Sequence, residues 1–566
     1  MDVESLELSQ KKPYSHQDAE TESASERSLH DDIPGVHQHM NWRLFVSLTA
    51  MSFLWVGSQI PLYLYGSILP LMFSDIGGAT DGKYQWMVIG FLIPNAALCP
   101  FVGSLSDLFG RRVIAMIGQT LLVVGPVVVA VSRTINIAIG GMVIAGIGAG
   151  LNELVALSGT SELVPARKRG FYVGAVVFTI LPFCASPLFA HLIARDSSWR
   201  RVGYLVSIWN FVGLVLVVLF YRDPARHAPR GSKMEIARGV DYIGGILSTT
   251  GVIGMMIGLQ WSAHQYPWTS AHVLVPFFGG VALLIAFGIY EWKVALFPMI
   301  PSALFLRSKR TMALILTITF FSGANFFVIL LIWPTQVYNM YGDDAIMAGV
   351  RNLPIGFGII AGAVIALLLI GLTKGRTTAL MLFFTACMTA ATGCMAFATP
   401  TNLNSVVYPI LTVAALSVGA VIFPCSLIAQ IVCPVDLIGT ITAITLSLRY
   451  IGGAIGFTIF YNVLFRKLYP HAELVPAELG REGVSKDPGV LYHLVLLGAQ
   501  SQYTELRKYI ANTPAVIRKD DAFDLVIQHL QYAFMYAYRW PYWISIAFGL
   551  VCVIAALGLR SVRAFL

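Results

Sequence analysis

Long apolar runs separated by short polar segments follow one another along most of the chain. Runs of about 20 apolar residues without charges are typical of helices that cross a membrane. Because backbone N–H and C=O groups in hydrocarbon must be satisfied within the segment or by close neighbours, each run predicts a helix. The pattern predicts fourteen spans, at roughly 44–72, 84–103, 113–132, 135–160, 171–193, 202–221, 240–261, 271–291, 312–336, 345–373, 378–398, 406–432, 438–464 and 540–559.

Two stretches of the chain depart from this pattern. Residues 1–42 are rich in Ser, Glu, Asp and His and have too few apolar residues to form a core, so we expect a disordered tail. This tail lacks the apolar stretch near its start that a cleavable signal peptide has. The segment at about 465–539, between the last two spans, predicts a long loop with weakly helical stretches at 503–510 and 520–534.

Composition and charge favour a membrane protein over a nucleic-acid-binding one. Hydrophobic residues make up 56% of the chain and charged residues 12%, whereas soluble domains have about 25% charged residues. The net charge of +8 comes from short basic clusters between spans, which orient helices in a bilayer rather than form a nucleic-acid surface.

The distribution of Lys and Arg predicts the orientation of the chain. These residues concentrate in alternate loops, including 111–112, 167–169 and 307–310. The opposite short loops hold only Lys83, Arg133, Arg195, Arg200 and Arg201. We therefore expect both termini in the cytoplasm and the long loop outside. We expect a multi-pass protein of the plasma membrane rather than of the vacuole, a choice that the charge pattern itself does not decide.

The sequence contains no pattern typical of an enzyme active site, a metal site or a nucleotide site. The seven cysteines lie in or beside apolar runs without CxxC or metal-type spacing, which favours core residues. The HExxH, GxSxG and P-loop patterns are missing, so nothing indicates enzyme chemistry or ATP as the energy source. We therefore expect a protein that is not an enzyme and that has no cofactor or bound metal.

The strongest motif is the segment GSLSDLFGRR, which follows the second span. Gly103 and Gly110 permit close helix approach and a tight turn. Asp107 can bind a helix N-terminus or a basic neighbour, and Arg111 and Arg112 can pair with acids. Such a cluster can form in one state and break in another, as a gate requires, although a simple hairpin with topology-setting charges is the alternative. The segment closely resembles the cytoplasmic loop between the second and third helices of the major facilitator superfamily.

Further motifs narrow this resemblance. The loop SELVPARKRG at 161–170 resembles the superfamily's loop after helix four, and the run GIGAGLNEL at 146–154 has the small-xxx-small spacing of closely packed membrane helices. Together with Pro-Phe-Cys at 182–184 and RYIGGAIG at 449–456, these segments are similar to the fungal trichothecene efflux pump family, in the fourteen-helix drug:proton antiporter branch. The sequence departs from that branch at Met142, in a neighbourhood where an Arg is usual.

The resemblance implies an all-α polytopic membrane protein with the major facilitator fold and fourteen transmembrane helices arranged as 6+2+6. The N-terminal six-helix bundle would cover 43–222, two accessory helices with their flanking loops 223–311, and the C-terminal bundle with the long extracellular loop 312–566. A small-molecule substrate would bind at the midplane between the bundles, with alternating access. Protons and the lipid bilayer would be the other partners, and we expect a monomer.

Glu153 is the first candidate for proton coupling, because ionisable residues within spans are costly and often functional. Burial favours the protonated form of a carboxylate, so Glu153 can bind and release a proton. A structural hydrogen bond to a neighbouring helix is the alternative. Arg449 in the thirteenth span can neutralise Glu153, attract an electronegative substrate or serve as a structural counter-charge. Asp107 is the second candidate for coupling.

The substrate site is predicted from polar and aromatic residues on spans four, nine and thirteen. Ligand sites combine aromatic walls with a few polar groups, although aromatic residues in membrane helices more often serve packing. The predicted substrate-binding residues are Asn152, Phe321, Asn325, Phe326, Gln336 and Arg449.

Three functions are compatible with these features. The first is proton-driven export of small, mostly apolar organic compounds, such as mycotoxins or drugs. Siderophore-iron transport is the alternative, and it would favour polar and charged cavity residues over aromatic ones. A transporter-like receptor is an alternative of another class, but such proteins usually carry long cytoplasmic extensions.

Overall fold

The computed structural model describes residues 42–76, 85–164, 168–223, 240–264, 266–295, 298–342, 344–373, 376–434, 437–499 and 502–562. The tail predicted at 1–42 therefore lies outside the described residues, apart from Trp42. The chain divides into two units. The first is Met1–Phe45, of which Trp42–Phe45 are described, and the second is Val46–Leu566, which holds the helices discussed below.

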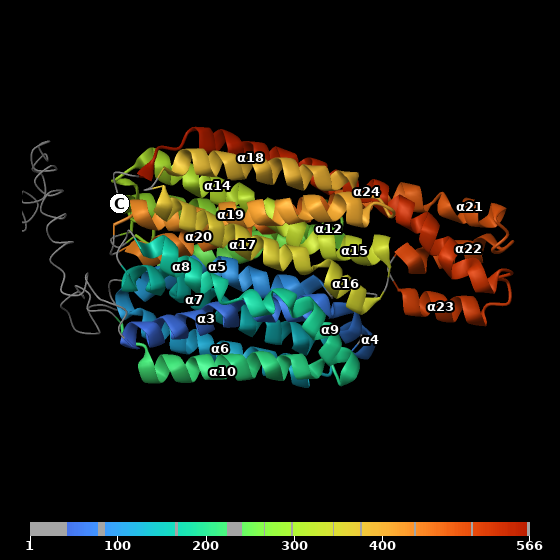
Figure 1. The fold of residues 1–566 in the computed structure, drawn as a ribbon, viewed down its shortest axis with the longest axis horizontal. Coiled ribbons are helices and arrows are strands. Elements are labelled where there is room, and N and C mark those ends of the chain that lie inside the picture. Colours follow the sequence, from blue (N-terminus) through green and yellow to red (C-terminus); the bar gives the residue numbers. More distant parts are fainter. Residues whose placement is uncertain are drawn as a thin grey trace, which may run out of the picture. The chain divides into compact units, whose positions relative to one another are not determined.

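All fourteen predicted spans are confirmed as helical segments long and apolar enough to cross a membrane. Within the described residues the secondary structure is helical, apart from an isolated β-bridge between Ser485 and Val516. The first eight spans, shown in Figure 1, are α3 (Trp42–Ser67), α5 (Gln85–Phe109), α6 (Arg111–Val131), α7 (Ile135–Leu163), α8 with η3 and α9 (Arg169–Phe178, Leu181–Ala185, Ser186–Asp196), α10 (Arg200–Phe220), α12 (Tyr242–His264) and α13 (Ala271–Lys293). The remaining six are α14 with η5 and α15 (Lys309–Phe327, Val328–Ile332, Trp333–Tyr341), α16 with α17 (Ala345–Arg351, Leu353–Leu372), α18 with η6 (Thr377–Cys394, Met395–Phe397), η7 with α19 (Leu403–Val407, Tyr408–Val432), α20 (Ile438–Ala472) and α24 (Lys519–Leu557).

Four of these spans, the fifth, ninth, eleventh and twelfth, change helix type along their length, and in the fifth, ninth and twelfth a proline lies at the change. Pro182 and Pro187 lie within the first two residues of η3 and α9, and a proline has no N–H for the hydrogen-bond ladder of a continuous helix. In the ninth span the π-helical segment η5 separates α14 from α15, which has Pro334 in its first turn. Short π segments within α-helices often lie near functional sites.

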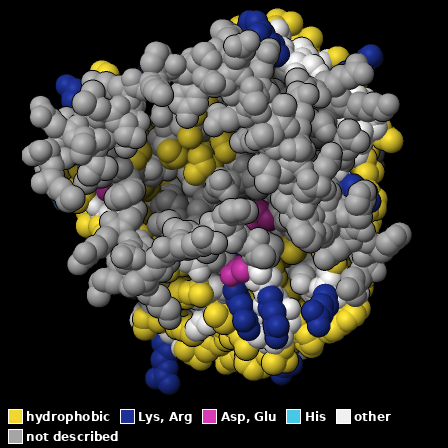
Figure 2. All heavy atoms as spheres, turned by 90° about the vertical axis from the view of Figure 1, so that its left-hand side faces the viewer, with side chains coloured by type: hydrophobic (Ala, Val, Ile, Leu, Met, Phe, Trp, Pro, Cys, Tyr) yellow, Lys and Arg dark blue, Asp and Glu magenta, His cyan; other side chains and the backbone are white. Residues whose placement is uncertain are grey.

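The two ends of the helical body differ in their chemistry. We call the end at which α5 passes into α6 the basic end, because it carries a set of Lys and Arg side chains that Figure 2 shows in dark blue. Hydrophobic side chains cover the flanks that border this face, as a lipid-embedded protein requires (Figure 2). The basic residues described at this end include Arg111, Arg112, Lys168, Arg169, Arg222, Lys293, Arg307, Lys309, Arg310, Arg376 and Arg560.

The segment predicted as a long loop is helical along most of its length. Helix α20 continues past the predicted end of the thirteenth span, and α24 begins well before the predicted start of the fourteenth. Between them lie α21 (Val475–Arg481), α22 (Pro488–Ala499) and α23 (Tyr503–Asn512), at the right of Figure 1. We call these three helices, with the adjoining ends of α20 and α24, the distal cap. Its core of fully buried apolar side chains consists of Leu479, Val484, Leu494, Leu506 and Val526.

Candidate functional site

A buried ion pair joins α7 of the fourth span to α20 of the thirteenth. One guanidinium nitrogen of Arg449 donates to Oε1 of Glu153. The hydroxyl of Tyr450, the next residue on α20, donates to Oε2 of the same carboxylate at 2.8 Å. The side chain of Glu153 is 0% exposed and that of Arg449 9%, so water screens the pair little. Two segments nearly 300 positions apart in the sequence therefore meet through one carboxylate.

The position of this pair along its helices places it deep in the helical body. Glu153 lies ten residues before the end of α7 at Leu163, and Arg449 eleven residues after the start of α20 at Ile438. At about 1.5 Å per helical residue, both lie roughly 15 Å from the ends of their helices. Charges at this depth are costly unless they are paired, and a broken buried pair leaves one charge uncompensated at a cost of about 3–5 kcal/mol.

Other polar groups surround the carboxylate. Tyr63 of α3 is within electrostatic range of Glu153, Arg449 and Cys184. Cys99 of α5 is within range of the same ion pair. Segments of the first, second, fourth, fifth and thirteenth spans thus converge on one site.

A second group of polar contacts lies nearer the basic end. Ser161 of α7 donates from its hydroxyl to Oε1 of Gln430 on α19 at 2.6 Å, and Nε2 of Gln430 donates to the hydroxyl of Thr442 on α20 at 2.8 Å. The Arg169 Nε–H donates to the carbonyl of Ser161 at 2.8 Å. All four side chains are buried. Ser161 and Arg169 are both part of the SELVPARKRG segment, which therefore helps to hold the fourth and fifth spans against the twelfth and thirteenth.

The predicted gating motif joins helices at the same end. Arg111 is fully buried, pairs with Glu162 of α7 at 2.6 Å and donates to Ser106. The backbone N–H groups of Arg111 and Arg112 both donate to one carboxylate oxygen of Asp223, at 3.0 and 3.1 Å. Asp223 thereby accepts from backbone N–H groups at the start of α6 that have no partner within the helix. Its negative charge also interacts favourably with the positive end of the dipole of α6.

The two glycines of the motif have different roles. Gly110 has φ of +93°, a backbone conformation that L side chains rarely adopt, and it forms the turn between α5 and α6. Gly103 allows α5 to approach α20: a Cβ at this position would lie 2.5 Å from that of Ala443 and 3.3 Å from the carbonyl oxygen of Gly439. The side chain of Asp107 lies outside what the structure describes.

The other predicted substrate residues do not converge on Glu153. In the amide orientation that satisfies both of its polar groups, Asn152 donates to the Ala115 carbonyl and accepts from the Gln119 N–H, both on α6. Asn325, oriented in the same way, bonds to the backbone of α24 at Ser545 and Gly549. These two side chains join neighbouring helices.

The aromatic candidates and Gln336 are similarly distributed. Gln336 accepts from the hydroxyl of Tyr542 on α24 at 2.6 Å, and the ring of Phe321 lies 6.0 Å from that of Phe548 on the same helix. Phe326 packs beside Phe327, and it is the ring of Phe327 that lies 6.2 Å from Tyr450.

Sequence reasoning assigned no site role to several residues that the structure places there, among them three neutral polar ones. Tyr450, Gln430 and Ser161 make contacts with Glu153 or across the basic end, but none of them is ionised, so the rule that singles out charges in spans passes over them. The sequence could have indicated Tyr450, because it is a polar residue directly beside the charged Arg449 in an apolar span.

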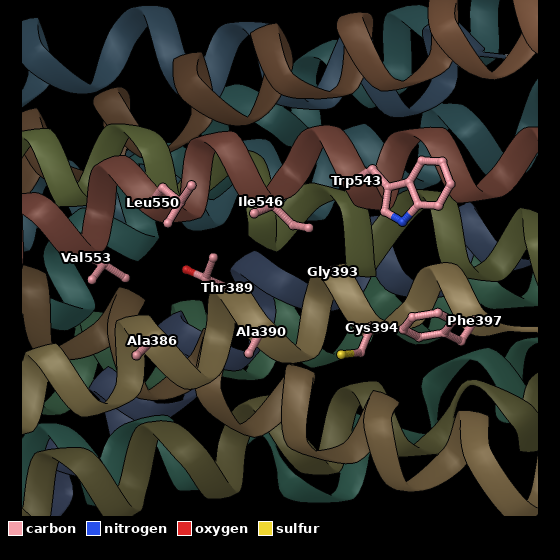
Figure 3. A pocket seen from close by; sticks show the side chains of 10 residues that line it. All are labelled: Ala386, Thr389, Ala390, Gly393, Cys394, Phe397, Trp543, Ile546, Leu550 and Val553. Carbon is pink, nitrogen blue, oxygen red and sulfur yellow. The ribbon is translucent and has the colours of Figure 1, made fainter.

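An apolar groove lies apart from this site, between α18 and α24. Figure 3 shows Thr389 and Gly393 on α18 facing Ile546 and Leu550 on α24, with Trp543 at one end. The hydroxyl of Thr389 is satisfied by its own helix, since it donates to the carbonyl of Thr385 at 2.7 Å. The groove therefore offers apolar surface and no charge.

Fourteen apolar spans, with an ion pair buried between the fourth and the thirteenth, define a polytopic membrane protein, and its similarity to known proteins makes it a transporter rather than an enzyme. Its fold is that of the major facilitator superfamily. It matches the proton:xylose symporter XylE with a TM-score of 0.55 at 13% identity, over 90% of this chain and 94% of that one. It matches the human organic anion transporter MFSD10 with a TM-score of 0.53 at 13% identity, over 75% and 94% of the two chains. At these identities the likeness concerns the fold alone.

The family follows from the sequence. The family model of the fungal trichothecene efflux pump (TRI12) matches residues 15–566, and the chain belongs to this family. Similar curated proteins include the MFS-type transporter gkaD of Penicillium citrinum, 29% identical over 57% of this chain and 54% of that one. The efflux pump FUS6 of Gibberella fujikuroi is 26% identical over 53% and 54%. The chain thus spans about half the length of the curated relatives it matches.

Proposed function

We propose that this protein exports small, mostly apolar organic compounds by proton antiport, and that Glu153 is the group that carries the proton. The observation that carries the proposal is the buried contact of Glu153 with Arg449 and Tyr450. In the proposed 6+2+6 arrangement, with bundles at 43–222 and 312–566 and accessory helices between them, this contact joins the two bundles. Similar proteins described as efflux pumps support the direction of transport.

The proposed mechanism follows from the charge of one carboxylate. While Glu153 is ionised, its attraction to Arg449 holds the bundles together in the depth of the membrane. A proton on Glu153 removes that attraction and leaves the guanidinium without a counter-charge, which favours a state in which Arg449 reaches water or substrate. The bundles then separate at the basic end, where Gln430 and Gly103 keep them closed in the present state.

The remaining features of the proposal concern orientation and substrate. We place the basic end and both termini in the cytoplasm, because the short loops at that end carry most of the Lys and Arg residues. The plasma membrane as location and a monomeric state are further parts of the proposal, which the charge pattern does not decide. Arg449 and Tyr63 provide polar contacts for the substrate where the spans converge. The other predicted substrate residues act indirectly, because their contacts with neighbouring helices shape the borders of this region. They are Asn152, Phe321, Asn325, Phe326 and Gln336.

The test is accumulation of substrates in cells with and without the protein, under an imposed pH gradient and after a protonophore has collapsed it. The panel contains a trichothecene-like sesquiterpenoid, a cationic dye and a ferric siderophore. We expect the sesquiterpenoid or the dye to accumulate less only while the gradient stands, and Glu153→Gln to abolish this difference. Glu291→Gln is the matched control, because this acid accepts hydrogen bonds from the backbone at Met299 and Ile300, outside the ion pair. Transport of the siderophore alone, or export that ignores both the gradient and Glu153→Gln, would refute the proposal.

A further inference from the structure

A histidine in the distal cap lies between two carboxylates. His529 of α24 has its Nδ1 3.0 Å from Oε2 of Glu478 and its Nε2 3.1 Å from Oε1 of Glu482. Glu478 belongs to α21 and Glu482 follows its last residue, so both acids come from the same turn of chain. The ring is 23% exposed, and the two carboxylates are 50% and 37% exposed. Solvent protons therefore reach all three groups.

Whether both contacts are hydrogen bonds depends on how many protons the imidazole and the two carboxyl groups hold. A neutral imidazole has one N–H donor and one bare nitrogen acceptor, and an ionised carboxylate can only accept. A neutral ring between two ionised carboxylates therefore leaves one bare nitrogen facing a bare oxygen. Both contacts become hydrogen bonds when one further proton is bound, which makes the ring an imidazolium with two N–H donors. The charge on that ring then attracts both acids, which strengthens the two bonds.

Other contacts near this cluster also connect the chain after α21 to the start of α24. Arg518, in the residue before α24, donates to the backbone carbonyl of Glu482 at 3.3 Å and pairs with Asp521 at 2.7 Å. These contacts join the start of α24 to the chain after α21, as does the isolated bridge between Ser485 and Val516. Among the described residues, the charged groups in contact with the ring of His529 are the two glutamates. The histidine contact is thus the part of the connection between α21 and α24 whose strength depends on pH.

We infer that His529, Glu478 and Glu482 form a proton-binding site in the distal cap, separate from the ion pair within the membrane, and that proton binding there fixes α21 to α24. Histidine suits this role, because its charge changes between roughly pH 5 and 8. The contact between α21 and α24 is therefore stronger at acidic pH than at neutral pH. This site does not depend on proton antiport, since it is defined by the cap alone.

The test is hydrogen–deuterium exchange of the full-length protein in lipid nanodiscs at about pH 5.5 and about pH 7.5, corrected for the chemical dependence of exchange on pH. Because partly exposed ion pairs are weak, we expect the amides of α21 to exchange up to about five-fold more slowly at the lower pH. His529→Gln should remove this difference. His493→Gln, on the neighbouring helix α22 where the ring packs against Tyr509, should retain it.

A second variant distinguishes proton binding from simple packing. In Glu482→Gln the side-chain amide can donate to the bare nitrogen of a neutral ring while the other ring nitrogen donates to Glu478. We therefore expect α21 in Glu482→Gln to be protected equally at both pH values, at a level near that of the unaltered protein at the lower pH. Protection that does not change with pH in the unaltered protein, or that changes equally in His529→Gln, would overturn the inference.

Discussion

Neutralising Glu153 should open the basic end of the transporter. Glu153→Gln keeps the shape of the side chain and an acceptor for Tyr450, but it removes the negative charge that balances Arg449. Because the glutamine amide can still form a neutral hydrogen bond here, the loss is that of a hydrogen bond to a charged group, about 1.5–3 kcal/mol, rather than the loss of about 3–5 kcal/mol for a charge left with no partner. The pair is too buried for solvent to weaken it. Since 1.4 kcal/mol corresponds to a factor of ten, the open population should rise by about ten- to a hundred-fold.

The reactivity of a buried thiol at the basic end measures this opening. Ser161 is fully buried where α7 meets α19, so a thiol introduced by Ser161→Cys reacts with a small alkylating reagent only when the helices separate. Peptide-level mass spectrometry gives its alkylation rate beside that of the buried native Cys552. We expect Glu153→Gln to raise the first rate ten- to a hundred-fold, as calculated above, and to leave the second unchanged. An unchanged rate, or an equal rise in Glu291→Gln, would show that the ion pair does not keep the basic end closed.

Three further changes test other parts of the structure. Arg449→Met should lower the melting temperature through a loss of about 3–5 kcal/mol, and addition of Glu153→Leu should recover most of it, because no unpaired charge then remains; a double variant as unstable as the single one would contradict this. Gly103→Val should reduce efflux at unchanged protein level because its side chain meets Ala443, whereas Gly140→Val, whose Cβ has open space, should transport normally. Arg111→Lys replaces a fork-shaped contact by a single ammonium and should cost about 1–3 kcal/mol in thermal unfolding; an unchanged melting temperature would argue against a structural role for the motif.

The spans could be predicted from the sequence because the bilayer imposes one simple condition, an apolar run of sufficient length. The distal cap could be predicted only in part. The weakly helical stretches predicted at 503–510 and 520–534 are confirmed by α23 and the first turns of α24. Helix α21 was missed because it is short and carries charged residues, and the charges of Lys519, Asp520 and Asp521 concealed that the same helix continues into the last span.

The site was only partly predictable for a related reason. Charges stand out in apolar spans, so the sequence singled out Glu153 and Arg449, and the structure brings them together. Which face of a helix a neutral polar residue occupies depends on the rotation of that helix against its neighbours. The side chain of Asn152 faces α6 and that of Asn325 faces α24. Neither direction can be derived from a helix that is apolar on all sides.

Helix α20 runs unbroken for 35 residues, which is about 50 Å. Arg449 lies about a third of the way along it, and its far end forms part of the distal cap. Because one continuous helix contains both Arg449 and a part of the cap, a movement of the cap can be transmitted to the ion pair. If Glu153 carries the proton as proposed, an antibody fragment that bound the cap more tightly in one transport state would change the proton affinity of Glu153, and protons would change the affinity of the antibody by the same factor. In the proposed orientation the cap lies outside the cell, so such a molecule would slow transport without entering the substrate path.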